Sequence, residues 1–112
     1  KKRMIAIFQP HRYTRTKILQ DDFGLCFDSA DYVIVTDIYA AGEKAIEGLS
    51  AEVIADKIHK HSPDKQVLYL KKEGIVENVL KILTPGDLLV TLGAGDITRI
   101  NDELVEGIKR KN

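Results

Sequence analysis

The chain has 112 residues, 44% hydrophobic and 30% charged, and this length predicts one domain that buries a core without disulfides or a structural metal. Lysine plus arginine and aspartate plus glutamate number 17 each, and the resulting net charge of zero argues against a general nucleic-acid binder or a protein held on an anionic membrane. The single cysteine, Cys26, excludes an internal disulfide and a multi-cysteine zinc site, and its surroundings predict inert packing in a reducing compartment.

The first half of the chain predicts two strands and two helices. Met4–Phe8 is a short apolar run closed by Pro10, which predicts a strand. The helix expected next has its apolar residues at Ile18, Leu19, Phe23 and Phe27. A second strand is predicted over Tyr32–Val35, and the helix that follows it begins at an N-cap serine, Ser50. The apolar face of that helix comprises Val53, Ile54 and Ile58.

The second half repeats this alternation. Strands are predicted over Val67–Leu70 and Leu88–Leu92, separated by a helix and by the turn Thr84-Pro85-Gly86. A closing helix follows, with Asp96 in position to cap it. The apolar stripes of these two helices comprise Val76, Val79, Leu80 and Leu83, and then Ile100, Leu104, Val105 and Ile108. No apolar run is long enough to span a bilayer, and no signal peptide is expected before the first strand.

Strands that alternate with helices of these lengths predict right-handed βαβ units, and therefore an α/β domain with helices on both faces of a parallel sheet. The strands are apolar along their whole length, which predicts burial on both faces. A chain that builds outward from its first strand and then returns to the other side gives the strand order 3-2-1-4. We therefore expect residues 1–112 to form one three-layer, Rossmann-like, doubly wound domain with a mostly parallel sheet of four parallel strands.

Cationic side chains follow the first strand in the run FQPHRYTRT, residues 8–16. His11, Arg12 and Arg15 lie within five residues of one another, and a guanidinium group fits a carboxylate or phosphate bidentately. Ligands of open α/β sheets bind at the carboxyl ends of the strands where the strand order reverses, which here is between the loops after the first and fourth strands. The run therefore indicates a site for a small anion; the alternative is that these residues are solvated loop charges.

The loop after the fourth strand reads GAGD and comprises Gly93, Ala94, Gly95 and Asp96. Its backbone can approach a ligand closely, and free N–H groups at the start of a helix can meet an anion. The loop lacks the Lys-Ser/Thr ending of a Walker loop and the third glycine of a dinucleotide fingerprint. We expect it to be either the facing wall of the crevice or a bare turn that needs a positive φ, and not an ATP-phosphate cradle.

The loop after the second strand places two carboxylates and a phenol at the same edge, from Asp37, Glu43 and Tyr39. The carboxylates either orient the cationic cluster, or meet a ligand ammonium group, or are a turn residue and a solvated charge. His59 and His61 cannot share a helix face, and we expect them either to interact with the negative end of that helix or to face water, rather than to bind a metal. Neither a metal site nor a catalytic nucleophile is expected in this chain.

Three motifs together resemble the C-terminal domain of the UDP-N-acetylmuramate:L-alanine ligases, a group of Mur ligases. They are FQPHRYTRT at 8–16, DIYAAGEKAIEG at 37–48 and GAGDI at 93–97, each after a predicted strand. The resemblance covers nearly the whole chain. The murein tripeptide ligases share this domain but not the full PHRYTR run, and they are the weaker match. The chain begins after the family's DDYGHHP segment, so we expect a first strand and helix to be missing at its N-terminal edge.

The resemblance implies a three-domain enzyme of the bacterial cytoplasm that uses ATP and magnesium to join L-alanine to UDP-N-acetylmuramate in peptidoglycan synthesis, with release of ADP. The first domain of such an enzyme binds the nucleotide sugar, and the central domain holds ATP and the metal. This chain resembles the last domain, which brings the amino acid and closes on the central domain. Alone it is expected to bind no cofactor tightly and to lack ligase activity; ADP release from the isolated 112 residues would contradict that expectation.

Carried over by position, the resemblance places His11, Arg12 and Arg15 around the alanine and the reacting carboxyl group, with an arginine on the alanine carboxylate. The GAGD loop forms the facing wall. In related ligases the loop after the second strand helps to select the amino acid. Candidates for that role are Asp37, Tyr39, Ala40 and Ala41. A function from another class stays open, namely a non-catalytic, doubly wound module whose His-Arg cluster binds a small anionic metabolite.

Overall fold

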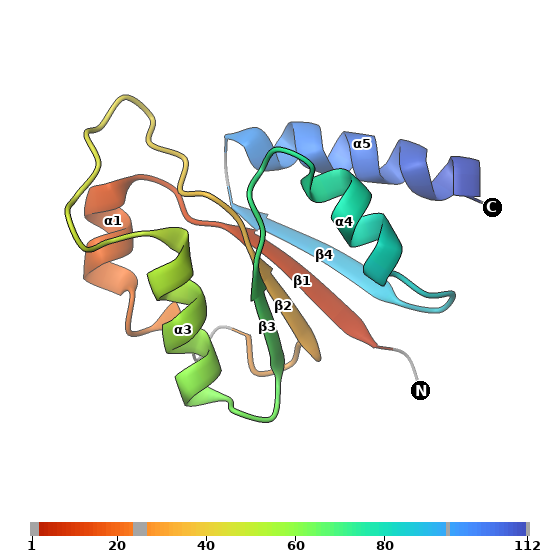
Figure 1. Ribbon diagram of the computed structural model, residues 1–112, viewed down its shortest axis with the longest axis horizontal. Coiled ribbons are helices and arrows are strands. Elements are labelled where there is room, and N and C mark those ends of the chain that lie inside the picture. Colours follow the sequence, from red (N-terminus) through yellow and green to blue (C-terminus); the bar gives the residue numbers. More distant parts are fainter. Residues whose placement is uncertain (1–2, 24–26, 94, 112) are drawn as a thin grey trace.

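Eight strands and helices alternate along the part of the chain that the computed structural model describes, which is residues 3–23, 27–93 and 95–111 (Figure 1). In chain order they are β1 (Met4–Gln9), α1 (Tyr13–Leu19), β2 (Tyr32–Val35), α3 (Ala51–His61), β3 (Gln66–Tyr69), α4 (Ile75–Ile82), β4 (Leu88–Gly93) and α5 (Asp96–Lys111). The expectations for Cys26 and Ala94 fall outside the described residues.

The four strands form one parallel sheet in the order β3-β2-β1-β4, which confirms the predicted topology. β1 lies inside the sheet, where it pairs with β2 on one side and with β4 on the other. The β1–β4 register runs from Met4 opposite Leu88 to Gln9 opposite Gly93, so the two strands end side by side. Helices supply the crossovers that parallel strands require, and the fold is the expected α/β, doubly wound, Rossmann-like one.

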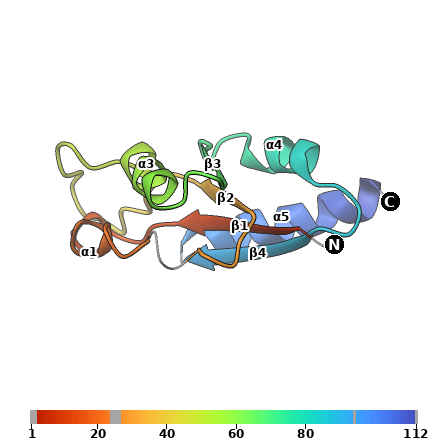
Figure 2. The same ribbon diagram turned by 90° about the horizontal axis from the view of Figure 1, so that it is seen from below.

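Two hydrophobic clusters occupy the two faces of the sheet. On one face the buried residues of α3 pack against alternate strand residues, among them Ala6. On the other face α4 and α5 pack against Ile5 and Ile7, because successive side chains of a strand point to opposite faces. The helix residues of this second cluster are Ile75, Val79, Ile97, Ile100 and Leu104. Figure 2 shows α1 and α3 toward one end of the molecule and α4 and α5 toward the other.

The first helix differs from its prediction. It covers Tyr13–Leu19, and two residues of its expected apolar face are solvent-exposed, Ile18 at 79% and Leu19 at 37%. Phe23 and Phe27 instead pack on the ring of Phe8, with ring centroids 4.9 and 5.2 Å away. The prediction was wrong because those phenylalanines follow the helix and reach the core from the connection to β2.

Burial of every strand on both faces was also a wrong prediction, because β4 is an edge strand. Leu88 and Leu92 are 50% and 40% exposed. They lie opposite Met4 and Phe8 in the register, on the face that α3 covers, but α3 packs on β2 and β3 and does not extend over β4. Val105 of α5, expected on the apolar stripe, is likewise 43% exposed.

Candidate functional site

The loops after β1 and β2 continue the sheet beyond its strands. The Arg12 N–H donates to the Tyr39 carbonyl at 2.7 Å, and the Tyr39 N–H donates to the Pro10 carbonyl at 2.8 Å. β4 ends beside β1, since Gly93 pairs with Gln9. The parallel strands thus bring the loops after β1, β2 and β4 to one edge, in the upper left of the sheet in Figure 1.

Tyr39 connects the three loops through its ring. The His11 imidazole stacks on it, with the ring centroids 5.7 Å apart and the planes 9° from parallel. Gly95 lies so close to the ring that a Cβ on this glycine would collide with it, and Gly95 also has a φ of +85°. The structure therefore brings together three of the predicted site residues, His11, Tyr39 and Gly95, in one continuous line of contacts.

The two arginines are exposed at the start of α1. Arg12 precedes the helix with a φ of 68°, and Arg15 follows one turn later. An open groove runs along α1, with the cations at one end and the exposed apolar side chains at the other. Its lining residues are His11, Arg12, Thr14, Arg15, Ile18 and Leu19. His11 belongs both to this groove and to the stack on Tyr39, whereas Tyr39 and the described residues of the GAGD loop do not line the groove.

Glu43 fixes the start of α1 from the loop after β2. Its Oε1 accepts from the N–H groups of Tyr13 and Thr14 at 2.7 and 3.1 Å, and its Oε2 accepts from the Thr14 hydroxyl at 2.7 Å. These bonds from Thr14, together with the Tyr13 N–H and the nearby Arg12 charge, lower the pKa of Glu43. Of the three open interpretations of this carboxylate, the geometry favours the one in which it orients the cationic segment.

Asp37 is held by groups of β3 and of the segment that follows it. Its Oδ1 accepts from the Tyr69 hydroxyl, and its Oδ2 accepts from the Lys72 N–H at 3.1 Å. The hydrogen bond to Asp37, with burial and the nearby negative charge, raises the pKa of Tyr69 to about 12. Because both carboxylate oxygens have protein partners, Asp37 supports the edge of the site instead of pointing a free carboxylate at a ligand.

Asp96, at the start of α5, is similarly engaged. Its Oδ2 accepts from Lys72 Nζ at 3.1 Å and from Gln9 Nε2 at 3.3 Å. Burial acts to raise the pKa of Asp96, but the hydrogen bonds from Lys72 and Gln9 outweigh it and lower the pKa overall. The same bond to Asp96 raises the pKa of Lys72.

Lys72 and Gln9 are the two residues of this site that the sequence reasoning missed. Lys72 bridges both carboxylates, with its N–H on Asp37 and its ammonium on Asp96, and Gln9 Nε2 also donates to the Asp37 carbonyl at 3.0 Å. Gln9 and Thr36 are fully buried, and Gln9 Oε1 and Thr36 Oγ1 have no hydrogen-bond partner among the described residues. Lys72 lies three residues after β3, at the same edge of the sheet, and this position was the one feature of the sequence that could have indicated its place in the site.

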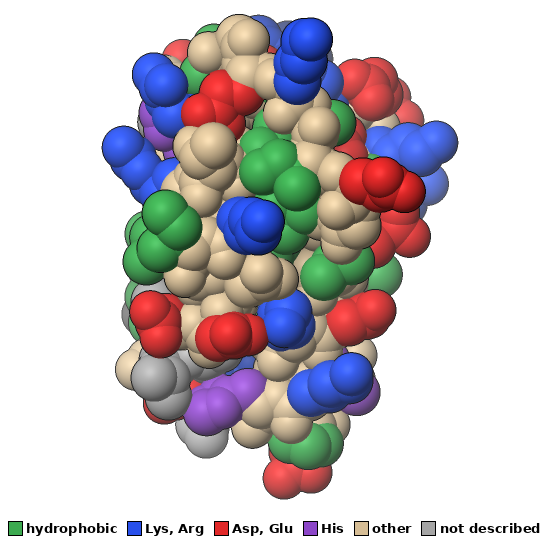
Figure 3. All heavy atoms as spheres, turned by 90° about the vertical axis from the view of Figure 1, so that its left-hand side faces the viewer, with side chains coloured by type: hydrophobic (Ala, Val, Ile, Leu, Met, Phe, Trp, Pro, Cys, Tyr) green, Lys and Arg blue, Asp and Glu red, His purple; other side chains and the backbone are tan. Residues whose placement is uncertain are grey.

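The surface around this edge carries charges of both signs. Figure 3 shows Lys and Arg side chains interspersed with Asp and Glu over that side of the molecule, without one large patch of a single sign. Within the described ranges, no group of three or more His, Cys, Asp or Glu side chains is arranged to hold a metal ion. The same ranges contain no helix with the length and apolar character needed to cross a membrane.

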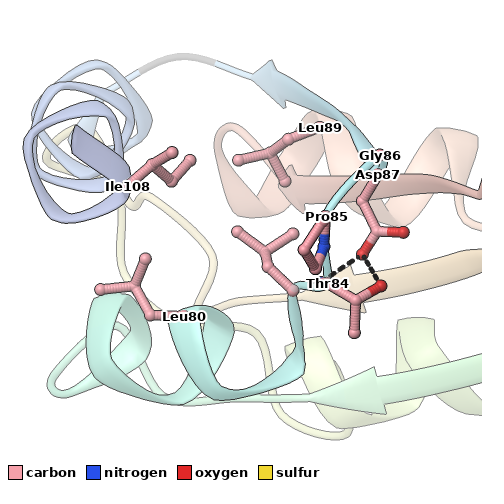
Figure 4. A pocket seen from close by; sticks show the side chains of 8 residues that line it. Leu80, Thr84, Pro85, Gly86, Asp87, Leu89 and Ile108 are labelled. Carbon is pink, nitrogen blue, oxygen red and sulfur yellow. Dashed lines mark hydrogen bonds between the residues drawn. The ribbon is translucent and has the colours of Figure 1, made fainter. Parts of the chain in front are cut away.

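A second cavity lies at the other end of β4. Leu80 of α4, Leu89 of β4 and Ile108 of α5 point into it, and the turn from Thr84 to Asp87 closes one side (Figure 4). Its volume is about 180 Å³. It is lined mainly by apolar side chains and contains none of the predicted site residues.

Most of this chain matches one family of known proteins. The family described as "Mur ligase, glutamate ligase domain" matches residues 1–95. A UDP-N-acetylmuramate–L-alanine ligase of Pelotomaculum thermopropionicum is 47% identical over 107 residues, which are 96% of this chain and 23% of the relative. The ligases of that name from Geotalea uraniireducens and Brachyspira hyodysenteriae are 46% and 47% identical, over 96% and 91% of this chain and 24% and 22% of their own lengths. The chain thus spans about a quarter of the curated relatives it matches.

Proposed function

The chain belongs to the Mur ligase family, in the part described as the glutamate ligase domain, and we propose that it is the amino-acid-binding domain of a UDP-N-acetylmuramate–L-alanine ligase. The longer protein would join L-alanine to UDP-N-acetylmuramate in the bacterial cytoplasm, with ATP consumed. Within it, this domain binds L-alanine and closes on a central domain.

One observation carries this proposal: the three motifs that define the resemblance meet at one edge of the sheet. The loop after β1 supplies His11 and the arginines, the loop after β2 supplies Tyr39, and the loop after β4 supplies Gly95, with stacking between the first two and close packing between the last two. Such an edge combines cations for a carboxylate with an aromatic wall and small residues, which suits a small amino acid.

The domain would act by positioning its substrate. A guanidinium of Arg12 or Arg15 would bind the alanine carboxylate, and the wall around Tyr39, Ala40 and Ala41 would limit the side chain to a small one. Holding the amine beside an activated carboxyl group replaces a bimolecular encounter with an oriented one. The cations also offset the negative charge that develops as the amine attacks.

The described residues offer neither a Walker-type loop for ATP nor a carboxylate cluster for magnesium. The GAGD turn lacks the lysine and hydroxyl of a Walker loop, and the described residues offer no cluster of carboxylates for a cation. We assign both groups to the remainder of the longer protein, and no chemical step of this domain depends on them.

The test is the substitution Arg12→Ala in the longer protein. Loss of a charge-assisted contact of roughly 1.5–3 kcal/mol should raise the KM for L-alanine about 10- to 100-fold and lower kcat/KM by at least as much, with the KM for ATP little changed. Arg110→Ala is the matched control, because that arginine is exposed in the last turns of α5, far from the site. Unchanged alanine kinetics for Arg12→Ala would reject the proposed site.

A further inference from the structure

The helix that follows Arg12 and carries Arg15 lacks stabilising features at its own N-terminus. α1 has seven residues, no acidic residue in its first turn and no side-chain cap from Arg12 at its N-terminus. Helices this short are marginal unless capped or packed. Its packing is limited to Thr16, its one fully buried residue, and to Tyr13, which packs partly buried against the core, since Ile18 and Leu19 are exposed.

Glu43 supplies the missing cap from a distant part of the chain. The loop after β2 runs past α1 on its way to α3 (Figure 1), and Glu43 reaches from it to three donors in the first two residues of the helix. The same loop holds the residue before the helix, because the Tyr39 carbonyl accepts from the Arg12 N–H. The loop after β2 therefore fixes the backbone on both sides of the Arg12–Tyr13 peptide bond.

We propose that Glu43 is the positioning residue for the two guanidinium groups: it holds the start of α1 so that Arg12 and Arg15 face the same groove in the orientation that L-alanine requires. This inference rests on the proposed function. Glu43 itself does not touch the substrate, because both of its oxygens are engaged by Tyr13 and Thr14.

This arrangement couples the selection of the amino-acid side chain to the binding of the amino-acid carboxylate. Residues 37–43 carry both the wall that limits the amino-acid side chain and the carboxylate that orients its anchoring arginines. A change in this loop should therefore alter the affinity for the amino-acid carboxylate even where no loop residue contacts it.

The experiment compares Glu43→Ala and Glu43→Gln in the longer protein. Glu43→Ala should raise the KM for L-alanine about tenfold, with kcat and the KM for ATP changed less than threefold. Glu43→Gln should recover most of the affinity, because its amide oxygen can accept from the two backbone N–H groups and its NH₂ can donate to the Thr14 hydroxyl. Glu47→Ala, at an exposed carboxylate of the same loop, is the control.

Hydrogen exchange of the 112-residue chain gives a second readout. The Tyr13 and Thr14 amides should exchange faster in Glu43→Ala than in the parent chain, and Thr14→Val, which removes the bond to Oε2 alone, should have a smaller effect. If Glu43→Ala does not fold, Thr14→Val should still raise the KM for L-alanine, by a few-fold.

The outcomes separate this inference from the proposed function. If Arg12→Ala raises the KM for L-alanine but Glu43→Ala and Thr14→Val leave it unchanged, the positioning role is wrong and the amino-acid site stands. If Arg12→Ala also leaves it unchanged, both are wrong. Equal impairment by Glu43→Ala and Glu43→Gln, with kcat lost and KM retained, would likewise overturn the positioning role.

Discussion

Asp87, in the turn before β4, collects four hydrogen bonds on one carboxylate. Arg3 donates from Nε at 3.2 Å and from a terminal nitrogen at 2.7 Å, and Thr84 donates from its N–H at 2.8 Å and its hydroxyl at 3.3 Å. These bonds lower the pKa of Asp87 to about 2, and the side-chain bond from Arg3 has the largest effect, followed by the backbone bond from Thr84. The carboxylate closes the turn onto the first strand and is itself only 6% exposed.

A carboxylate whose pKa is lowered on folding stabilises the protein above its unfolded-state pKa, and the contribution is lost as the pH falls through the folded-state value. Asp87→Asn should therefore lower the stability at pH 7, and the difference from the parent chain should shrink between about pH 4 and pH 2. Urea unfolding at pH 7, 4 and 2 measures this. Asp56→Asn, at an exposed carboxylate of α3, is the control, and a difference for Asp87→Asn that is the same at every pH would contradict the argument.

Single residues were predictable from the sequence where their role is local. Ser50 caps α3 as expected, accepting from the Val53 N–H at 3.3 Å. Lys72 escaped prediction because its partners, Asp37 and Asp96, come from other parts of the chain and meet it only in the folded sheet. The sequence indicated that a turn at position 95 needs glycine. It did not indicate that the ring of Tyr39 packs against that glycine.

At the scale of elements, two features of the turn between β4 and α5 require glycine at position 95. Gly95 has a positive φ of 85° and also packs against Tyr39, whereas Gly86 has a φ of 93° with nothing within 4 Å of the place where a Cβ would lie. Gly86→Ala should cost about 1 kcal/mol of stability from backbone strain alone. Gly95→Ala should cost roughly 1–3 kcal/mol more, because the methyl group displaces the Tyr39 ring.

Unfolding free energies of the two variants test this comparison. In a Tyr39→Ala background the extra cost of Gly95→Ala should disappear, since the colliding ring is gone. Equal costs for Gly95→Ala with and without Tyr39 would show that the ring does not pack against the turn.

Among the elements, β2, α3 and the later strands could be predicted because the spacing of their hydrophobic residues and their capping residues indicate the same element. α1 could not, since its apolar residues have helical spacing and yet Ile18 and Leu19 face solvent. Spacing reports which residues share a face, and it does not report whether any other element covers that face. The start of α1 depends on Glu43, a contact with no local signature.

At the scale of the molecule, the strand order 3-2-1-4 followed from the rules for parallel sheets, and it is the feature that brought the three loops together. The same order leaves β4 at an edge. This strand reads LLVTLG, without a charge or proline, and exposes Leu88 and Leu92 on one face. Edges of this kind pair readily with other strands.

We expect the 112-residue chain to self-associate through this edge as its concentration rises. Leu88→Lys should weaken the association, because a charged side chain on an edge strand opposes pairing. Ile18→Lys, which removes an even more exposed side chain from α1, should leave the association unchanged. Sedimentation velocity over a range of concentrations distinguishes these outcomes, and an equal effect of both variants would mean that the β4 edge is not the contact.

The packing of β1 sets the order in which the chain can finish folding. Within this domain, Ile5 and Ile7 are synthesised well before Ile97, Ile100 and Leu104 of α5, which cover them in the folded sheet. The hydrophobic cluster on this face of the sheet therefore stays open until α5 has been made, and the high contact order of the β1–β4 pairing adds a slow closing step. In a nascent chain stalled before α5, a chaperone that binds extended apolar strands would find its target in β1.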